Sequence, residues 1–461
     1  MSSPAAPLVT RKRRSLAGPF VIIIVGVVFL LVNLGIWDKR SLLIVFARYW
    51  PVLIIVWGLI KLLEYYQAQR EGTRASGIGV GGVFLLVFLV LAGFSASQAV
   101  RVNWSDMMDQ VDWGDDMKPF FGGDIHRFDD HLQQAFPVSA SLHVVSDRGG
   151  IIVNASDDNT IKVLAHKQVV ADNDEQAKKF DSQTRPTISV AGDVVTVTAN
   201  TTGGGQHSIT TDLEIFLPRK VALDLAARRG DVEVHGRDGD VKISNSRGDV
   251  VLSDLGANSV LTLRKGSLTA NHVHGNLTLD GRLDDTHISD VAGNVTLTGE
   301  FFGDISLNKI AKTTSFKSSR TDLEFSKLDG DLTIASGDLR GQSMTGPVRL
   351  LTTSKDIHLD SISGDLRLEN KNGSVEVDAS RLPLGNIRIA NSKGDISLIL
   401  PRNAAFSLQA RTRDGEIQSE FEAVRVNSGD KESSATGSVG NNGPRLEINN
   451  EYGSIEIRKA G

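Results

Sequence analysis

Apolar residues follow two different patterns along this chain. Up to about residue 100 they stand in long blocks, and from about residue 138 they alternate with polar residues. Long apolar blocks are typical of membrane-spanning helices, and alternation with a period of two is typical of strands that bury one face. The pattern therefore predicts three transmembrane helices followed by an all-β domain.

The three apolar blocks are residues 19–37, 42–63 and 78–100. The first carries no charge, and at about 1.5 Å per residue it would span roughly 28 Å, close to the hydrocarbon thickness of a bilayer. We expect a two-helix hairpin over 19–63, a loop over 64–77 and a third helix over 78–100. The lipid bilayer is thus the first expected partner.

Basic residues flank these blocks unevenly. The tail of residues 1–18 contains four consecutive basic residues, 11–14, and Lys61, Arg70 and Arg74 surround the loop between the second and third blocks. The positive-inside rule assigns both regions to the cytoplasm. Three crossings of the cytoplasmic (inner) membrane then leave the carboxyl-terminal domain in the periplasm or outside the cell.

Residues 101–137 form an acidic stretch that contains eight aspartates. We interpret it as an extracytoplasmic linker that holds the following domain away from the bilayer. Trp104, Met108 and Val111 stand at helical spacing, so a short interfacial helix is the alternative.

A nine-residue unit repeats from Gly230 to about residue 402. It reads Gly-Asp-φ-x-φ, where φ is apolar. Glycine permits a turn with positive φ, and the next Asp or Asn can hydrogen-bond to nearby backbone. The two φ positions predict a short strand with inward residues such as Leu332, Leu366 and Ile389, and an outward residue such as Thr333.

Every second unit carries one further apolar residue in its turn, at a mean spacing of about eighteen residues. These residues are Leu255, Val273, Val291, Ile310, Leu328, Met344 and Ile362. Two strands therefore make one coil, with one apolar corner and one polar corner. Such coils stack into a parallel β-helix, or solenoid, because each buries its apolar face only against its neighbours.

The regions beside the regular repeats, 138–229 and 403–461, keep the alternation but lose the period. We expect them to cap the solenoid. A short polar helix over 174–182 and a flexible loop over 427–444, rich in Ser, Gly and Asn, are predicted within them.

Two parts of the sequence resemble bacterial protein families. The segment GPFVIIIVGVVFLLVNLGIW and the later RYWPVLIIVWGLIKLL, together about 18–63, resemble the transmembrane region of LiaI/LiaF-like envelope-stress proteins. The Gly-Asp-Val-x-Val units and the closing YGSIEI resemble the bacterial β-strand-repeat family of adhesin-like proteins over about 138–461. The second resemblance implies a parallel β-helix in the cell envelope and carries no catalytic residues with it.

Composition narrows the chemistry further. The chain has no cysteine, and its net charge of −5 comes from 50 basic and 55 acidic side chains, which gives no indication of nucleic-acid binding. After Trp113 there is no Trp and only Tyr452 among tyrosines, so nothing indicates the sugar-stacking cleft of a polysaccharide-degrading enzyme. We expect no enzymatic activity, no metal and no cofactor.

Three motifs that suggest function are explained better by the repeat. Arg-Gly-Asp occurs at 229–231 and 247–249, but the unit supplies Gly-Asp throughout. His272 and His274 share a turn, but the pattern positions no third metal ligand. The units also lack the Gly-Gly-x-Gly-x-Asp sequence of calcium-binding β-rolls.

One outward column is a candidate binding site. In the late coils it contains Arg349, Arg367 and Arg388. Strands about 4.8 Å apart would bring the three guanidinium groups within roughly 10 Å of one another, an arrangement suited to a polymer that carries carboxylate or phosphate. Glu369 and Glu376 lie nearby in sequence and could neutralise the column.

We therefore interpret the chain as a membrane-anchored β-solenoid that acts as a non-enzymatic, adhesin-like binding or envelope-sensing module. Its expected partner is an anionic envelope polymer or another membrane protein. Two alternatives remain at this stage. One is a regulator of an envelope-stress sensor kinase, as the LiaF resemblance implies, and the other is a structural envelope protein whose solenoids self-associate.

The predicted topology has a direct test. Reporter fusions after Glu71 and after Val138 should report opposite sides of the membrane, because three crossings separate the amino terminus from the solenoid. Cytoplasmic signals from both fusions would contradict the assignment.

Overall fold

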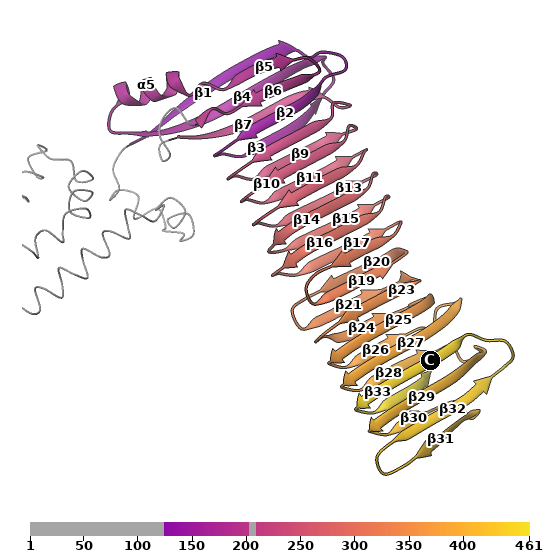
Figure 1. Ribbon diagram of the computed structural model, residues 1–461. Helices are drawn as coiled ribbons and strands as arrows, with labels where there is room; N and C mark the ends of the chain where they lie inside the picture. The colour runs from indigo at the N-terminus through magenta and orange to yellow at the C-terminus, as the bar shows by residue number, and fades with distance from the viewer. Residues whose placement is uncertain (1–123, 202–208) are drawn as a thin grey trace, which may run out of the picture. The chain divides into compact units, whose positions relative to one another are not determined.

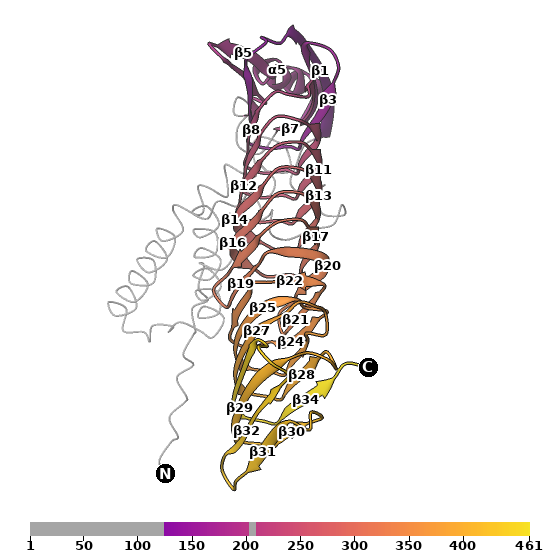
Figure 2. The ribbon, with the colours of Figure 1, turned by 90° about the vertical axis from the view of Figure 1, so that its right-hand side faces the viewer.

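The computed structural model describes residues 124–201 and 209–461, which belong to one unit, Gly122–Gly461. The strands of this unit alternate between two long sheets that face each other (Figure 1). Figure 2 shows β11, β13 and β17 along one side and β12, β14 and β16 along the other. The three expected membrane spans and residues 101–123 of the linker lie outside the described residues. Within the described ranges, no helix has the length and apolar character needed to cross a membrane.

The first stack of coils is regular. One sheet, called sheet A, contains β9 (Val232–Arg237), β11 (Val250–Leu255), β13 (Leu268–Val273), β15 (Thr286–Val291) and β17 (Ile305–Ile310). The facing sheet, called sheet B, contains β8 (Leu223–Ala227), β10 (Val241–Asn245), β12 (Ser259–Leu263), β14 (Leu277–Leu283), β16 (Val295–Phe301) and β18 (Thr314–Lys317). Neighbouring strands are parallel, and Val250 pairs with Leu268 eighteen residues later. The expected two strands per coil are thus confirmed.

The expected alternation of side chains is also present. Leu332 and Ile389 are fully buried, Leu366 is 2% exposed, and Thr333 is only half-buried. Inward side chains stack in rows, as Leu350, Leu368 and Ile389 do on three successive strands. A continuous apolar core therefore lies between the two sheets.

The apolar corner follows the eighteen-residue spacing. All seven residues expected there are buried. In six of the coils the preceding residue adopts a positive φ near 50–57°, as Asp254 and His272 do. This left-handed residue turns the chain so that the next side chain points into the core. The residue equivalent to Leu255 in the coil before is Arg237, which pairs with it in register.

The polar corner is held by two kinds of contact. Gly230 and Gly248 have positive φ, and a Cβ on Gly248 would lie 2.2 Å from the carbonyl oxygen of Gly230, so these two positions require glycine. The aspartate that follows each of them accepts a backbone N–H of the next coil, as when Asp249 N donates to Asp231 Oδ1 at 2.8 Å. Inside the corner, Asn391 Nδ2 donates to two carbonyl oxygens at 3.0 and 3.2 Å.

The solenoid is not parallel throughout, which corrects the expected fold in one coil. The strands β19 (Thr321–Phe325) and β20 (Lys327–Ile334) run antiparallel to β18 and β17. A tight turn after β18 reverses the chain, and a second turn before β21 reverses it again. The alternation is the same in either chain direction, so this coil buries Leu323, Phe325 and Leu332 without disturbing the core.

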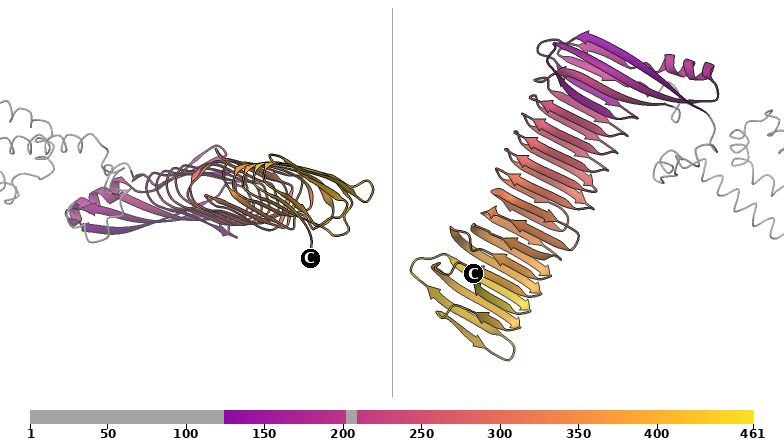
Figure 3. Two further views of the ribbon diagram at one scale, coloured as in Figure 1. Left: turned by 90° about the horizontal axis from the view of Figure 1, so that it is seen from below. Right: turned by 180° about the vertical axis from the view of Figure 1, so that it is seen from behind.

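A second stack follows the reversed coil, and it is parallel except for β31 and β32 near its end. Its sheet A strands are β21 (Asp338–Gln342), β22 (Met344–Thr345), β24 (Asp356–Asp360), β26 (Val375–Asp378), β28 (Ile396–Leu400), β30 (Ile417–Ser419) and β34 (Ile455–Lys459). Its sheet B strands are β23 (Val348–Thr352), β25 (Gly364–Asn372), β27 (Leu384–Lys393), β29 (Phe406–Asp414), β31 (Val424–Ser428), β32 (Ser433–Val439) and β33 (Arg445–Tyr452). The right-hand view of Figure 3, which is from behind, shows the regular stacking of these strands.

The carboxyl-terminal end of the solenoid is assembled out of sequence order. Strand β33 lies between β27 and β29, and β34 lies between β28 and β30. The expected flexible loop over 427–444 is wrong, because β31 and β32 form an antiparallel hairpin there and β32 pairs with β29. Hydrogen bonding to β29 orders a segment whose composition alone suggested a loop.

The amino-terminal end contains β1 (Asp124–Ala135), β2 (Ser141–Ser146), β3 (Ile151–Ser156), β4 (Thr160–Ala171), α5 (Asp174–Gln183), β5 (Thr187–Ala191), β6 (Val194–Thr198) and β7 (Ile209–Pro218). The expected polar helix is confirmed as α5. Residues 124–135, expected at the end of the acidic linker, instead form β1, which pairs antiparallel with β4 along its whole length. Asp129 and Asp130 point to opposite faces of β1, and each has a basic partner on β4: Asp129 lies 2.8 Å from His166, and Asp130 lies 3.0 Å from Lys167.

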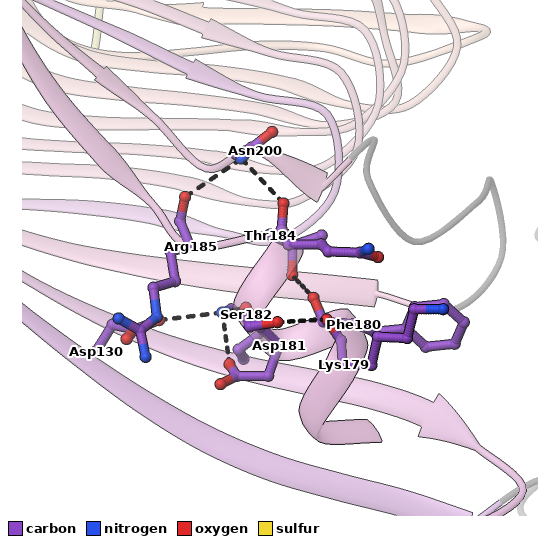
Figure 4. A network of polar contacts seen from close by, with 10 residues as sticks. Asp130, Lys179, Phe180, Asp181, Ser182, Thr184, Arg185 and Asn200 are labelled. Atoms are coloured by element: carbon purple, nitrogen blue, oxygen red, sulfur yellow. Dashed lines mark hydrogen bonds and ion pairs between the residues drawn. The ribbon is translucent and has the colours of Figure 1, made fainter. Parts of the chain in front are cut away.

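One of these pairs is buried. Lys167 on β4 is 1% exposed, and its Nζ lies 3.0 Å from Asp130 Oδ2 and 2.7 Å from Asp181 Oδ1. Asp130 comes from β1 and Asp181 from α5 (Figure 4). The last turn of α5 is closed by Thr184, whose hydroxyl donates to Phe180 O at 2.7 Å. Lys167 therefore ties the helix to both strands.

The core alternation predicts unequal effects of the same substitution at adjacent positions of β16. Leu297→Asp would place an unpaired carboxylate in the core and should cost about 3–5 kcal/mol locally. The matched control Thr296→Asp, on the outer face, should cost about 0.5 kcal/mol or less. Thermal melts of the full chain in lipid nanodiscs and hydrogen exchange of β14, β16 and β18 would measure both. Equal loss of protection would contradict the assigned faces.

Candidate functional site

The three arginines of the candidate site occupy one column of sheet B. Arg349 on β23 pairs in register with Arg367 on β25, and Arg367 pairs with Arg388 on β27. All three are exposed on the outer face. The interval between Arg367 and Arg388 is longer than eighteen residues, and a register shift near Gly364 absorbs the insertion. The structure thus brings together the residues that the period placed in one column.

Carboxylates hold two of these side chains. Arg367 donates to Glu369 Oε1 from Nε at 3.0 Å and from Nη2 at 2.7 Å. Arg349 Nη1 lies 3.6 Å from Asp322 Oδ2 on β19. Glu376, the other acid near the column in sequence, is on β26 of sheet A, where it contacts Arg458 at 3.4 Å. Glu369 therefore competes with any anion for Arg367, whereas Glu376 does not.

Arg388 differs from its two neighbours. The side chain two residues later on the same outer face is Ala390 instead of an acid, and no ion pair of Arg388 is found among the described residues. The next residue along the row is Glu447 on β33, which accepts from Asn449 Nδ2 at 3.5 Å. Arg388 is thus the member of the column whose guanidinium is most available to an external anion.

A shallow polar cavity of about 580 Å³ opens near this end of sheet B. It is lined by Ser407, Leu408, Gln409, Ala423, Arg425, Thr436, Gly437, Ser438 and Arg445. These residues come from β29, β32 and β33, and from the start of β31 and the residue before it. No pattern in the sequence indicates this cavity, because its strands are adjacent only through the out-of-order assembly of the cap.

Both Arg-Gly-Asp sequences are structural. Gly230 and Gly248 belong to the glycine column, and Asp231 and Asp249 each accept a backbone N–H of the next coil at 2.8 Å. Their carboxylates are thus already engaged in the ladder that joins neighbouring coils. Asp356 takes the same role in the second stack, where the backbone N–H and hydroxyl of Ser374 lower the pKa of its carboxyl.

His272, one of the two histidines of the expected turn, lies between two carboxylates. His272 Nδ1 is 3.8 Å from Asp254 Oδ1, and its Nε2 is 3.6 Å from Asp290 Oδ2. These three residues occupy the left-handed position of successive coils. Within residues 124–201 and 209–461, no group of three potential ligands is arranged to hold a metal ion.

Two buried cations were not recognised from the sequence. The Arg237 side chain is fully buried and donates to Leu217 O at 2.9 Å and Val221 O at 3.1 Å. Burial lowers the pKa of Arg237 to about 10, so it remains protonated at neutral pH. Lys355 is 7% exposed and donates to Ala335 O and Ser336 O, and burial lowers its pKa. Both have backbone carbonyls as partners, which is a structural role.

Comparison with solved structures finds two similar bacterial proteins. One is described as a "putative cell adhesion protein" from Clostridium sporogenes, with 10% identity, coverage of 72% of this chain and 100% of that chain, and a TM-score of 0.17. The other is a "putative adhesin" from Parabacteroides distasonis, with 11% identity, coverage of 73% and 98%, and a TM-score of 0.18. Comparison with curated proteins finds no match.

Two families match the chain itself. The LiaF transmembrane domain matches residues 17–105, and the Toastrack DUF4097 family matches residues 141–458. Both resemblances drawn from the sequence are thereby confirmed. Because the second match covers more than half of the 461 residues, the chain belongs to the Toastrack DUF4097 family.

Proposed function

We propose that this protein is a non-enzymatic binding module of the bacterial cell envelope, anchored in the cytoplasmic membrane, whose solenoid binds an anionic polymer along the arginine column. The observation that carries the proposal is the register of Arg349, Arg367 and Arg388 on three adjacent parallel strands. Like charges in such a column repel one another, and an anion between them removes that cost.

The geometry suits a linear ligand. Adjacent strands repeat about every 4.8 Å, so the column offers guanidinium forks at regular intervals along the solenoid. Each fork can donate two parallel hydrogen bonds to a carboxylate or phosphate. A polymer with repeated anionic groups gains from several such contacts at once, since each later contact forms at high effective concentration.

The proposed location follows from the family match and the charge pattern. The LiaF transmembrane domain over residues 17–105 supports membrane anchoring. The basic residues around the apolar blocks support a cytoplasmic amino terminus and an extracytoplasmic solenoid. In that orientation the arginine column faces the compartment in which anionic envelope polymers occur.

Removal of the column should weaken binding. With the full chain in phosphatidylcholine nanodiscs, the variant R349Q/R367Q/R388Q should bind teichoic acid or lipopolysaccharide about tenfold more weakly at low salt, since exposed charge pairs contribute roughly 0.2–1 kcal/mol each. Binding by the native chain should weaken as salt is raised. The control K242Q/R282Q/K317Q removes three positive charges from β10, β14 and β18 in the first stack of the same sheet and should bind as the native chain does.

A gain-of-function variant tests the same site. Glu369→Gln removes the negative charge that pairs with Arg367, so affinity for the same polymers should rise about two- to fivefold at low salt. Unchanged affinity in both the triple variant and Glu369→Gln, with unchanged melting temperature, would remove the column as the binding site.

A second candidate function is supported by the LiaF transmembrane match, which favours a regulator of an envelope-stress sensor kinase. In that case the membrane region contacts the kinase and the solenoid detects the stress. A chain that lacks residues 138–461 should then still restrain kinase phosphorylation but should no longer respond to envelope damage. Identical phosphorylation in this strain, the native strain and a full deletion strain would exclude the regulatory function.

A further inference from the structure

The arginine column continues across the carboxyl-terminal cap as a single row of outward positions. Arg388 pairs in register with Glu447, Glu447 with Gln409, Gln409 with Thr436, and Thr436 with Arg425. These contacts run from β27 through β33, β29 and β32 to β31. At about 4.8 Å per strand, Arg388 and Arg425 are roughly 19 Å apart along the sheet. The far end of the row is the polar cavity.

Six of the nine lining residues of the cavity are polar or basic, and Leu408, Ala423 and Gly437 make up the rest. Ser407, Thr436 and Ser438 contribute hydroxyl groups, and Gln409 contributes an amide. Arg425 and Arg445 contribute two guanidinium groups. No acidic and no aromatic residue is among the lining residues. Such a set of donors favours an anionic ligand with many hydroxyl groups, and it offers no surface on which a nucleobase or a neutral sugar ring could stack.

The local backbone explains why the sheet is hollowed here. Gly437 pairs with Val424, and a Cβ at Gly437 would lie 2.5 Å from Ala423 O. The absence of a side chain thus lets the start of β31 lie close against β32. Arg445 is positioned independently, because its backbone N–H donates to Asn386 Oδ1 at 3.0 Å and its Nη2 donates to Gln409 Oε1 at 3.4 Å. The cavity is therefore built by strand pairing and not by a loose loop.

Charges around the cavity define its selectivity. Glu447 is the nearest acid: it pairs in register with Arg388 and with Gln409, follows Arg445 by two residues on the same outer face, and is contacted by Asn449. Glu422 precedes Ala423 and is exposed. Neither belongs to the lining, so an acidic group can approach Arg425 and Arg445 without meeting a carboxylate inside the cavity.

We propose that this cavity binds one acidic sugar unit of an anionic polysaccharide, with the sugar carboxylate between Arg425 and Arg445 and the ring hydroxyls on Ser407, Gln409, Thr436 and Ser438. A volume of about 580 Å³ lies within the usual range for small-ligand sites, roughly 300–1,000 Å³. This inference rests on the proposed function, since it names the polymer class and the end of the row at which a terminal unit is held.

The test uses the full chain in phosphatidylcholine nanodiscs and two matched probes, a digalacturonate and its methyl ester, measured by calorimetry. The acid should bind, and the ester, which has no carboxylate charge, should bind at least about tenfold more weakly. The variant R425Q/R445Q should lower affinity for the acid about tenfold, whereas the control R411Q/R413Q, which removes two charges from β29 outside the lining, should not change it. Ser438→Trp, which fills the cavity, should abolish binding while the melting temperature is unchanged.

A long polygalacturonate separates this inference from the function on which it rests. The column variant R349Q/R367Q/R388Q should bind the short probe normally and the long polymer weakly. Native affinity of R425Q/R445Q for the short acid, or equal binding of acid and ester, would overturn the cavity as an acidic-sugar site. If the long polymer then still depends on the column, the proposed function stands without the cavity. If neither variant affects the long polymer, both proposals fall.

Discussion

Hydrogen bonds between successive coils are the constraint on which the rest of this structure depends. Backbone N–H groups of one coil find their acceptors in the next, as when Val232 N donates to Asp249 O at 2.9 Å. A single coil would leave these groups unpaired and its apolar face exposed, so neither ladder nor core exists without neighbours. Side chains add to the same connection at the corners, where Asp231 bonds the coil that follows. Each coil is therefore stabilised by its contacts with the coils on either side of it.

Three buried cations have partners at strand ends, in turns or on neighbouring elements. Arg237 precedes the column of apolar corner residues and donates to carbonyls at the end of β7 and in the turn that follows it. Lys355 donates to carbonyls in the hairpin that leaves the reversed coil. Lys167 joins α5 to β1 and β4 through two aspartates. In each case hydrogen bonds or ion pairs compensate for the burial of the positive charge.

The outward positions of the strands are not restricted by the core or by the corners. Inward positions are apolar and the polar corner is rich in Gly, Asp and Asn, but an outward residue such as Arg388 meets only solvent and its neighbours in the row. Charged or polar rows on this surface are therefore where function can be added without altering the fold. The proposed polymer site and the cavity at its end both lie on this outer surface, and the same row of outward residues connects them.

The nine- and eighteen-residue periods were sufficient to predict the strands, both corners and the column of Arg349, Arg367 and Arg388. This succeeded because alternation fixes which face a side chain takes, and the period fixes which residues share a row. The interval of seven residues between Gly330 and Gly337 was the one irregularity near the reversed coil, and it did not reveal the direction of the chain.

Only the tertiary structure decided which strands are neighbours where the period fails. Hydrophobic alternation reads the same in both chain directions, so it could not show that β19 and β20 run backwards. It also could not show that β33 and β34 insert between strands that precede them in sequence. The cavity of Arg425, Arg445 and Gln409 follows from that insertion. Its residues were unpredictable because strand pairing between distant segments is set by the edges available in the folded chain, and not by any local pattern.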